Sequence, residues 1–150
     1  MKIRWCSYIP NSLQNGEGVR DVIFLSGCIH NCDGCHNIEA QDPNYGKDIE
    51  LEEIIKILKL NNDMVDGITL SGGDPLFQYE KTVELCKAIK NNLENNNIWL
   101  YTGYTFKYVQ KHFSEILKYV DVIVDGRYEK DLPSAEHRGS NNQQIIILNK

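Results

Sequence analysis

The chain has 150 residues, of which 41% are hydrophobic and 25% charged, and its formal net charge is −5 at pH 7. This length and composition are typical of one globular domain with its own core. There is no excess of Lys and Arg for a phosphate backbone, no apolar run of membrane-spanning length, and no secretion signal in the first residues. We therefore expect a single domain over residues 1–150, a cytoplasmic location, and neither nucleic acid nor a membrane as a partner.

Apolar segments and helical patterns alternate along the chain. Short apolar runs predict strands covered on both faces, and apolar residues at three- and four-residue steps predict helices between them. Asp48, Asp74 and Thr105 are the expected capping residues of three helices. The alternation predicts an α/β fold with a largely parallel sheet. The strands are expected at 22–25, 68–70, 98–101, 120–124 and 145–148, and the helices over 51–58, 75–93 and 106–117.

The polar and Gly-rich segments of the chain directly follow the predicted strands. Carboxyl ends of parallel strands meet at one edge of a sheet, where such folds bind their ligands. We therefore expect Tyr101, Thr102, Tyr104 and Asp125 to face a site at this edge. Arg127 is the candidate for contact with a carboxylate or a partner. The segments are SGCIHNCDGCHN (26–37), SGGDP (71–75), YTGY (101–104) and DGRY (125–128).

Three cysteines form a C-x3-C-x2-C cluster after the first predicted strand. Thiolates are soft ligands that favour zinc or an iron–sulfur cluster. A structural zinc site needs a fourth ligand. Three cysteines without a fourth would instead leave one iron of a [4Fe-4S] cube without a protein ligand, and an open position indicates chemistry. The cysteines are Cys28, Cys32 and Cys35, and the fourth zinc ligand would be His30, His36 or Cys6.

The remaining cysteines and two histidines have simpler interpretations. Cys86 lies on the inward stripe of a predicted helix, where a free thiol acts as a small hydrophobe, and Cys6 is also interpreted as structural. His30, inside the cysteine loop, is expected to face solvent. His112, among charged residues of a predicted helix, is expected at the surface.

At this point the chain resembles the radical S-adenosylmethionine enzymes, whose signature is the C-x3-C-x2-C motif read here as CIHNCDGC. More narrowly, it is similar to the activating proteins of anaerobic ribonucleotide reductases, and the resemblance extends nearly from end to end. Three departures stand out. Gly34 takes the place of an aromatic, the Gly-Gly-Glu motif reads Gly72-Gly73-Asp74, and His137 and Gln144 replace an aromatic and a basic residue. The resemblance rests on NGEGVR (15–20), FLSGCIHNCDGCHN (24–37), ITLSGGDPL (68–76), WLYTGYT (99–105), VDVIVDGRY (120–128) and HRGSNNQ (137–143).

The resemblance implies an open partial (β/α) barrel of the radical S-adenosylmethionine type with a [4Fe-4S] cluster on Cys28, Cys32 and Cys35. It implies that S-adenosylmethionine binds beside the cluster, with its methionyl group near the backbone of the Gly-Gly motif and its nucleoside near the last cysteine. The glycines also have a simpler interpretation, as a tight strand-to-helix turn capped by aspartate. The implied cosubstrate contacts are Gly34, Cys35, His36, Gly72, Gly73 and Asp74.

The implied activity is that of a glycyl-radical activating enzyme, comparable to the activase of formate C-acetyltransferase. Its substrate would be the large subunit of the anaerobic ribonucleotide reductase, and a low-potential donor such as flavodoxin or ferredoxin would supply electrons. Two alternatives stay open. One is another short radical S-adenosylmethionine enzyme, acting on a different glycyl-radical enzyme or on a deazapurine precursor, as 7-carboxy-7-deazaguanine synthase does. The other is a non-catalytic zinc or electron-transfer module.

Overall fold

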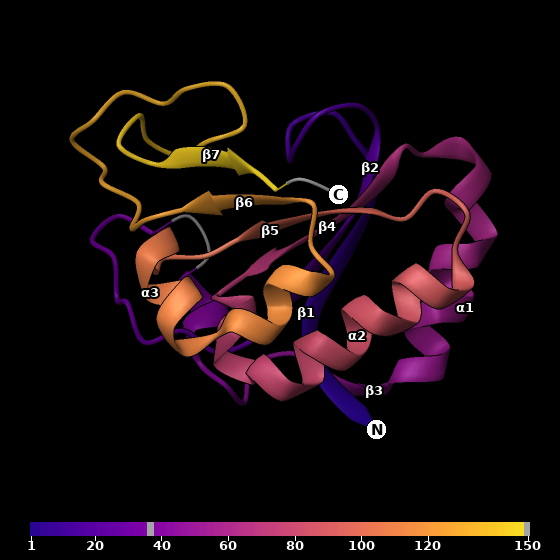
Figure 1. The fold of residues 1–150 in the computed structure, drawn as a ribbon. Coiled ribbons are helices and arrows are strands. Elements are labelled where there is room, and N and C mark those ends of the chain that lie inside the picture. The colour runs from indigo at the N-terminus through magenta and orange to yellow at the C-terminus, as the bar shows by residue number, and fades with distance from the viewer. Residues whose placement is uncertain (36–37, 149–150) are drawn as a thin grey trace.

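A computed structural model describes residues 1–35 and 38–148. Figure 1 shows one sheet with α1, α2 and α3 on the same side of it. Short 3-10 helices lie at Ile38–Gln41, Asn62–Met64, Pro75–Gln78 and Ser114–Lys118. The strands are β1 (Lys2–Ser12), β2 (Arg20–Leu25), β3 (Lys47–Glu50), β4 (Gly67–Gly72), β5 (Asn97–Tyr101), β6 (Val122–Asp125) and β7 (Gln144–Ile147), and the α-helices are α1 (Leu51–Asn61), α2 (Tyr79–Asn92) and α3 (Phe106–His112).

The described residues form one seven-stranded sheet in the order β3-β1-β2-β4-β5-β6-β7. The four central strands, β2, β4, β5 and β6, are parallel to one another. The outer strands β1, β3 and β7 run antiparallel to their neighbours. This confirms the α/β class, and β3 and β7 remain unjoined, so the sheet is open. All four central strands end at the same edge, which brings the segments that follow them together.

The two faces of the sheet are covered differently. On one face, alternate residues such as Ile23, Leu70 and Leu100 pack against buried side chains of the helices in the main core. The other face carries Trp99, Val122 and Val124 in a second, smaller cluster. The segments that follow β1 and β6 lie over this second face (Figure 1). Side chains pointing to opposite faces in alternation explain how one strand contributes to both clusters.

Two of the three predicted helix caps are confirmed. The Thr105 side chain accepts a hydrogen bond from Tyr108 N, at 3.2 Å, at the start of α3. Asp74 caps the short helix at Pro75–Gln78 through Leu76 N, and α2 begins only at Tyr79.

The prediction that Asp48 caps a helix is wrong. Asp48 belongs to β3, and the helix begins after Glu50, which makes no side-chain capping bond. The Asp48 carboxylate instead forms an ion pair with Arg4 at 3.1 Å. The residue that the local sequence assigned to a helix end therefore lies in a strand, where its side chain pairs with the neighbouring strand β1.

The sequence analysis did not predict β1 or β3. Both are antiparallel strands at one side of the sheet, and most residues of the two strands are exposed or half-buried. Their patterns therefore lack the continuous apolar run by which the central strands were found. Within the described residues, no helix is both long enough and apolar enough to span a membrane.

Candidate functional site

The three loop cysteines and the Gly-Gly turn line one cavity at the carboxyl ends of the central strands. This cavity has a volume of about 650 Å3. Cys28, Cys32 and Cys35 come from the segment after β2, and Gly72 and Gly73 come from the end of β4. The structure thus brings together two motifs that lie more than thirty residues apart in the sequence.

Left-handed backbone turns shape the cysteine loop. Gly27, Asn31 and Gly34 have φ values of 101°, 51° and 72°. The start of the loop is fixed by hydrogen bonds from Gly27 N to Ala40 O and from Cys28 N to Gln41 O. These turns direct the three cysteines of a short segment toward one cavity.

The loop cysteines differ from the other two cysteines in their surroundings. All three are free and half-buried, whereas Cys86 is fully buried in the main core, as predicted. The Cys6 thiol lies 3.0 Å from the Ser26 hydroxyl, outside the residues that line the cavity. Burial raises the pKa of Cys28 to about 11 and that of Cys86 to about 12. A ligand that needs Cys28 as a thiolate therefore has to compensate for its desolvation.

The donor set fits an iron–sulfur cluster. Among residues 1–35 and 38–148, no three Cys, His, Asp or Glu side chains converge closely enough to hold one metal ion. A structural zinc site needs four ligands around one point. The thiolates of a cubane bind different irons and need only surround a shared cavity, which is the arrangement seen here. The three cysteines and the cavity therefore fit a cluster.

The two glycines of the SGGDP motif are required by close packing against protein backbone. A Cβ on Gly73 would lie 2.4 Å from both Gly27 O and Ala40 O, and a Cβ on Gly72 would lie 2.3 Å from Leu25 N and O. Gly72 also has a φ of 119°. These contacts support the strand-to-helix turn interpretation. The expected approach of this backbone to a methionyl group stays a prediction.

The Asp74 carboxylate accepts hydrogen bonds from several neighbouring protein groups. It is buried, and its Oδ1 accepts the capping bond from Leu76 N at 3.0 Å. Its Oδ2 accepts hydrogen bonds from Thr102 Oγ1 and Gly103 N, each at 2.9 Å. Asp74 is not among the residues that line the cavity, and its contact with the cosubstrate stays a prediction.

The prediction that His30 faces solvent is wrong. His30 is only 7% exposed, and its Nε2 lies 2.6 Å from Asp74 Oδ2. The ring also packs edge-on against Tyr104 at a centroid distance of 4.5 Å. The absence of a side chain at Gly103 makes room for it, since a Cβ there would lie 2.4 Å from the ring. The sequence around His30 could not show this, because its partners are more than forty residues away.

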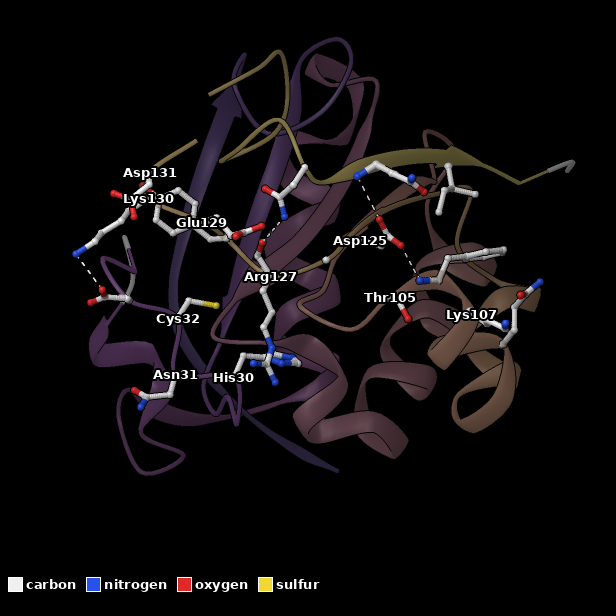
Figure 2. Close-up of a pocket in the computed structure, with 18 residues that line it drawn as sticks. His30, Asn31, Cys32, Thr105, Lys107, Asp125, Arg127, Glu129, Lys130 and Asp131 are labelled. Atoms are coloured by element: carbon white, nitrogen blue, oxygen red, sulfur yellow. Dashed lines mark hydrogen bonds and ion pairs between the residues drawn. The ribbon is translucent and has the colours of Figure 1, made fainter. Parts of the chain in front are cut away.

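A second cavity lies on the other side of the cysteine loop. Its volume is about 1050 Å3, and it shares His30 and Cys32 with the first cavity. Arg127 lines it, and Figure 2 shows the side chain extending toward His30. Asp125, at the same edge, accepts hydrogen bonds from Phe106 N and Gln144 N and so holds α3 and β7 in place. Of the predicted strand-end residues, Tyr101 and Thr102 line the first cavity, and Asp125 and Arg127 line the second.

Two covering segments contribute cavity residues for which the sequence predicted no ligand contact. Asn15 lies over the sheet because its carbonyl accepts a hydrogen bond from Thr69 Oγ1 at 2.6 Å. On the other segment, the His137 carbonyl accepts one from the Tyr101 hydroxyl, and the His137 ring lies 5.5 Å from that of Trp99. Arg138 brings a guanidinium to the cavity. The only sequence signals were the NGEGVR and HRGSNNQ segments, which contain these residues.

Of two predicted nucleoside contacts, Gly34 lies within the described residues and His36 lies outside them. Gly34 has a φ of 72°, and a Cβ there would lie 2.9 Å from the side chain of Lys130, which forms a 2.9 Å ion pair with Asp33. Both stay predictions as cosubstrate contacts.

Comparison with known proteins decides the family. The model of a 4Fe-4S single cluster domain matches residues 14–146. The anaerobic ribonucleoside-triphosphate reductase-activating protein of Enterobacteria phage T4 is 39% identical over 140 residues, which cover 91% of this chain and 88% of that protein. The chain belongs to the family of anaerobic ribonucleoside-triphosphate reductase-activating proteins.

Cellular members of this family are similar over nearly their whole length. The activating protein of Haemophilus influenzae is 36% identical, with 95% of this chain and 97% of that protein covered. That of Escherichia coli K12 is 34% identical, with 94% and 96% covered. The 4Fe-4S family model covers residues 14–146, which include Cys28, Cys32 and Cys35, and it supports the iron–sulfur interpretation over zinc.

Proposed function

We propose that this chain is a glycyl-radical activating enzyme that cleaves S-adenosylmethionine at a [4Fe-4S] cluster. Its protein substrate would be the large subunit of the anaerobic ribonucleotide reductase. One observation carries the proposal. Cys28, Cys32 and Cys35 share a single cavity with the Gly72-Gly73 turn at the carboxyl edge of a parallel sheet. The names of the relatives support the choice of target.

Each residue of the cavity has a role in this proposal. Cys28, Cys32 and Cys35 would hold three irons and leave the fourth open to the cosubstrate. The backbone at Gly72 and Gly73 would lie against the methionyl group. Arg138 supplies a positive charge that a carboxylate would meet in this cavity. Gly34, Cys35 and His36 would lie near the nucleoside.

The cofactors supply the radical chemistry, and the protein orients and shields them. Held by Cys28, Cys32 and Cys35, a reduced cluster would supply the electron for reductive cleavage of S-adenosylmethionine to methionine and a 5′-deoxyadenosyl radical, and hydrogen transfer from a glycine Cα of the partner would then give 5′-deoxyadenosine and a glycyl radical. The chain's own residues would keep water away. Tyr101 lines the cavity, and its hydroxyl donates a hydrogen bond to the His137 carbonyl of the covering segment, whose His137 ring also contacts Trp99.

The open sheet suits a macromolecular substrate. Neither sheet edge closes on the other, and the cysteine cavity adjoins the larger cavity lined by Arg127. A peptide loop of a partner would need such an entrance. We interpret the fold as a partial barrel of the radical S-adenosylmethionine type working in the cytoplasm. Flavodoxin or ferredoxin is the proposed electron donor.

The deciding experiment is anaerobic activation followed by electron paramagnetic resonance. The reconstituted chain is mixed with the large subunit, S-adenosylmethionine and a low-potential reductant. The expected result is the doublet of a glycyl radical together with stoichiometric 5′-deoxyadenosine. Cys86→Ala is the matched control and should retain the activity, whereas Cys32→Ala should lose it.

Other outcomes would point elsewhere. 5′-Deoxyadenosine without a radical on this subunit would indicate another substrate, such as a different glycyl-radical enzyme. A colourless protein with stoichiometric zinc would contradict the proposal.

A further inference from the structure

His30 and Asp74 form a buried pair that the proposed chemistry does not use. Nε2 of His30 lies 2.6 Å from Oδ2 of Asp74, and the two side chains are 3% and 2% exposed. His30 lies inside the cysteine loop, and Asp74 directly follows Gly73. The pair therefore joins the segment that carries the cluster ligands to the turn proposed to bind the cosubstrate.

The Asp74 carboxylate collects hydrogen bonds from the segments after three neighbouring strands. His30 follows β2, Leu76 follows β4, and Thr102 and Gly103 follow β5. Since β2, β4 and β5 are adjacent in the sheet, this one side chain connects the loops at the rim of the cavity. A buried hydrogen-bond network whose members are satisfied fixes the geometry of the segments that it joins.

His30 is also the side chain that anchors the middle of the cysteine loop. Between Cys28 and Cys32 it is buried, whereas Ile29 and Asn31 are exposed. The ring is confined by Tyr104 and by the backbone of Gly103. Within the described residues, its Nδ1 is buried without a hydrogen-bond partner, so Asp74 is the one polar partner that orients the ring.

We propose that His30 is a positioning residue whose hydrogen bond to Asp74 locks the cysteine loop against the Gly72-Gly73 turn. The lock fixes the separation between the three thiolates and the backbone that would receive the cosubstrate. This proposal rests on the proposed function only for the identity of the bound groups, the cluster and S-adenosylmethionine. The lock itself is a property of the metal-free chain and can be measured there.

The first experiment compares His30→Gln with His30→Met in the metal-free protein. The two side chains are similar in length and flexibility, but only the Gln amide can donate a hydrogen bond to Asp74. The rates at which iodoacetamide alkylates Cys28 and Cys32 are measured by peptide mass spectrometry at one fixed pH. His30→Met should raise these rates about tenfold, and His30→Gln should stay within about twofold of the wild type.

Two internal controls separate loop opening from unfolding. Cys86 is fully buried, so its alkylation reports global unfolding and should stay slow in both variants. His112→Ala removes an exposed histidine and should leave every rate unchanged. Equal alkylation rates of Cys28 and Cys32 in His30→Met, His30→Gln and the wild type would overturn the lock.

The second experiment uses the reconstituted protein. His30→Met should keep its iron, yet its affinity for S-adenosylmethionine should fall about ten- to hundredfold, as when a residue that orients a site is lost. The change that S-adenosylmethionine produces in the electron paramagnetic resonance spectrum of the reduced cluster should be lost in His30→Met and restored in His30→Gln. A purely structural role would lower thermal stability without this selective loss.

The two experiments test the proposed function and the His30–Asp74 lock independently. A wild-type protein that binds neither cluster nor cosubstrate would refute the proposed function, and the alkylation rates would still decide the lock. A His30→Met protein with normal S-adenosylmethionine affinity and a normal spectral change would overturn the positioning role.

Discussion

Four of the five cysteines illustrate how burial separates a ligand from a core residue. Cys86 is fully enclosed by apolar side chains, and burial raises the pKa of its thiol to about 12. Cys28, Cys32 and Cys35 are half-buried and line a cavity. Thiolates bind metals, and a thiol in an apolar core stays protonated and inert. The residue type is the same, so only its surroundings decide its chemistry.

The first prediction follows from this contrast. Replacing any one of Cys28, Cys32 or Cys35 by Ala should remove most of the iron after anaerobic reconstitution. Cys86→Ala should retain the iron and lose only about 1 kcal/mol of folding free energy, because it deletes one small buried group. Iron analysis, visible absorbance and urea denaturation measure these effects. A Cys86→Ala protein without colour beside a brown Cys32→Ala protein would refute the ligand assignment.

The second prediction concerns Gly73, where a methyl group would meet the backbone of the cysteine loop. Gly73→Ala should lower stability and iron content together, since its Cβ would lie 2.4 Å from Gly27 O, next to Cys28. Overpacking of this kind typically costs about 1–3 kcal/mol. Thermal denaturation and iron content on the same anaerobic sample provide the measurement.

Gly126→Ala is the matched control for Gly73→Ala. Gly126 has a φ of 93°, but a Cβ there would meet only Gln143 Cα at 4.0 Å. Its substitution should cost about 1–2 kcal/mol of backbone strain and leave the iron in place. If Gly73→Ala kept its iron and its stability while Gly126→Ala did not, the packing argument would fail.

At the scale of elements, Arg20 joins three parallel strands at the edge opposite the cavity. The side chain is buried, and its Nε donates to Thr69 Oγ1 at 2.8 Å. One terminal nitrogen donates to Glu17 O, and the other to Ile68 O and Asn97 O. The guanidinium also lies 5.6 Å from the centre of the Trp99 ring. Burial lowers its pKa to about 10, so the group remains charged at neutral pH.

The third prediction is a large loss of stability on changing Arg20. Arg20→Met should destabilise the protein by about 3 kcal/mol or more, because several buried carbonyl groups would lose their donors. Arg20→Lys should rescue little, since an ammonium cannot reproduce the fork of the guanidinium. The measurement is urea denaturation of the metal-free chain.

Arg4→Met is the comparison for this prediction. Arg4 forms an ion pair with Asp48 at a partly exposed position, and such pairs contribute about 0–1 kcal/mol. Its loss should therefore be small. If Arg20→Met and Arg4→Met lowered the free energy of unfolding by similar amounts, the buried hydrogen bonds of Arg20 would contribute no more than an exposed ion pair.

At the scale of the whole molecule, an open sheet leaves the carboxyl edge accessible. The cysteine cavity adjoins a larger one, and the two share His30 and Cys32. Accessibility admits a macromolecular partner, and it equally admits small oxidants. Function under anaerobic conditions is consistent with such an exposed centre, and the names of the relatives describe an anaerobic system.

The fourth prediction is oxygen lability that the cosubstrate reduces. The reconstituted protein should lose its visible absorbance in air, because one iron without a protein ligand is open to oxidants. S-adenosylmethionine should slow this loss several-fold by occupying that position, whereas S-adenosylhomocysteine is a control with altered charge at sulfur. Absorbance followed over time after mixing with air provides the measurement. Identical rates with and without S-adenosylmethionine would argue against its binding at the open iron.

The sequence by itself determined the central strands, the cap at Thr105, the burial of Cys86 and the iron–sulfur family. These features depend on local patterns, namely apolar runs, helical spacing and a compact cysteine motif, or on similarity along the chain. Local pattern also gave errors. Asp48 was assigned to a helix end although it pairs in β3, and the mostly exposed strand β1 was overlooked.

Only the tertiary structure decided which residues meet at the rim of the cavity. His30 and Asp74 are 44 residues apart and pair because β2 and β4 are neighbours, and Gly103 makes room for the ring because β5 lies next to β4. Arg138 lines the same cavity as the cysteines because the segment after β6 folds back over the sheet. Strand order and chain reversal are set by the packing of the whole domain, so no local stretch of sequence contains them.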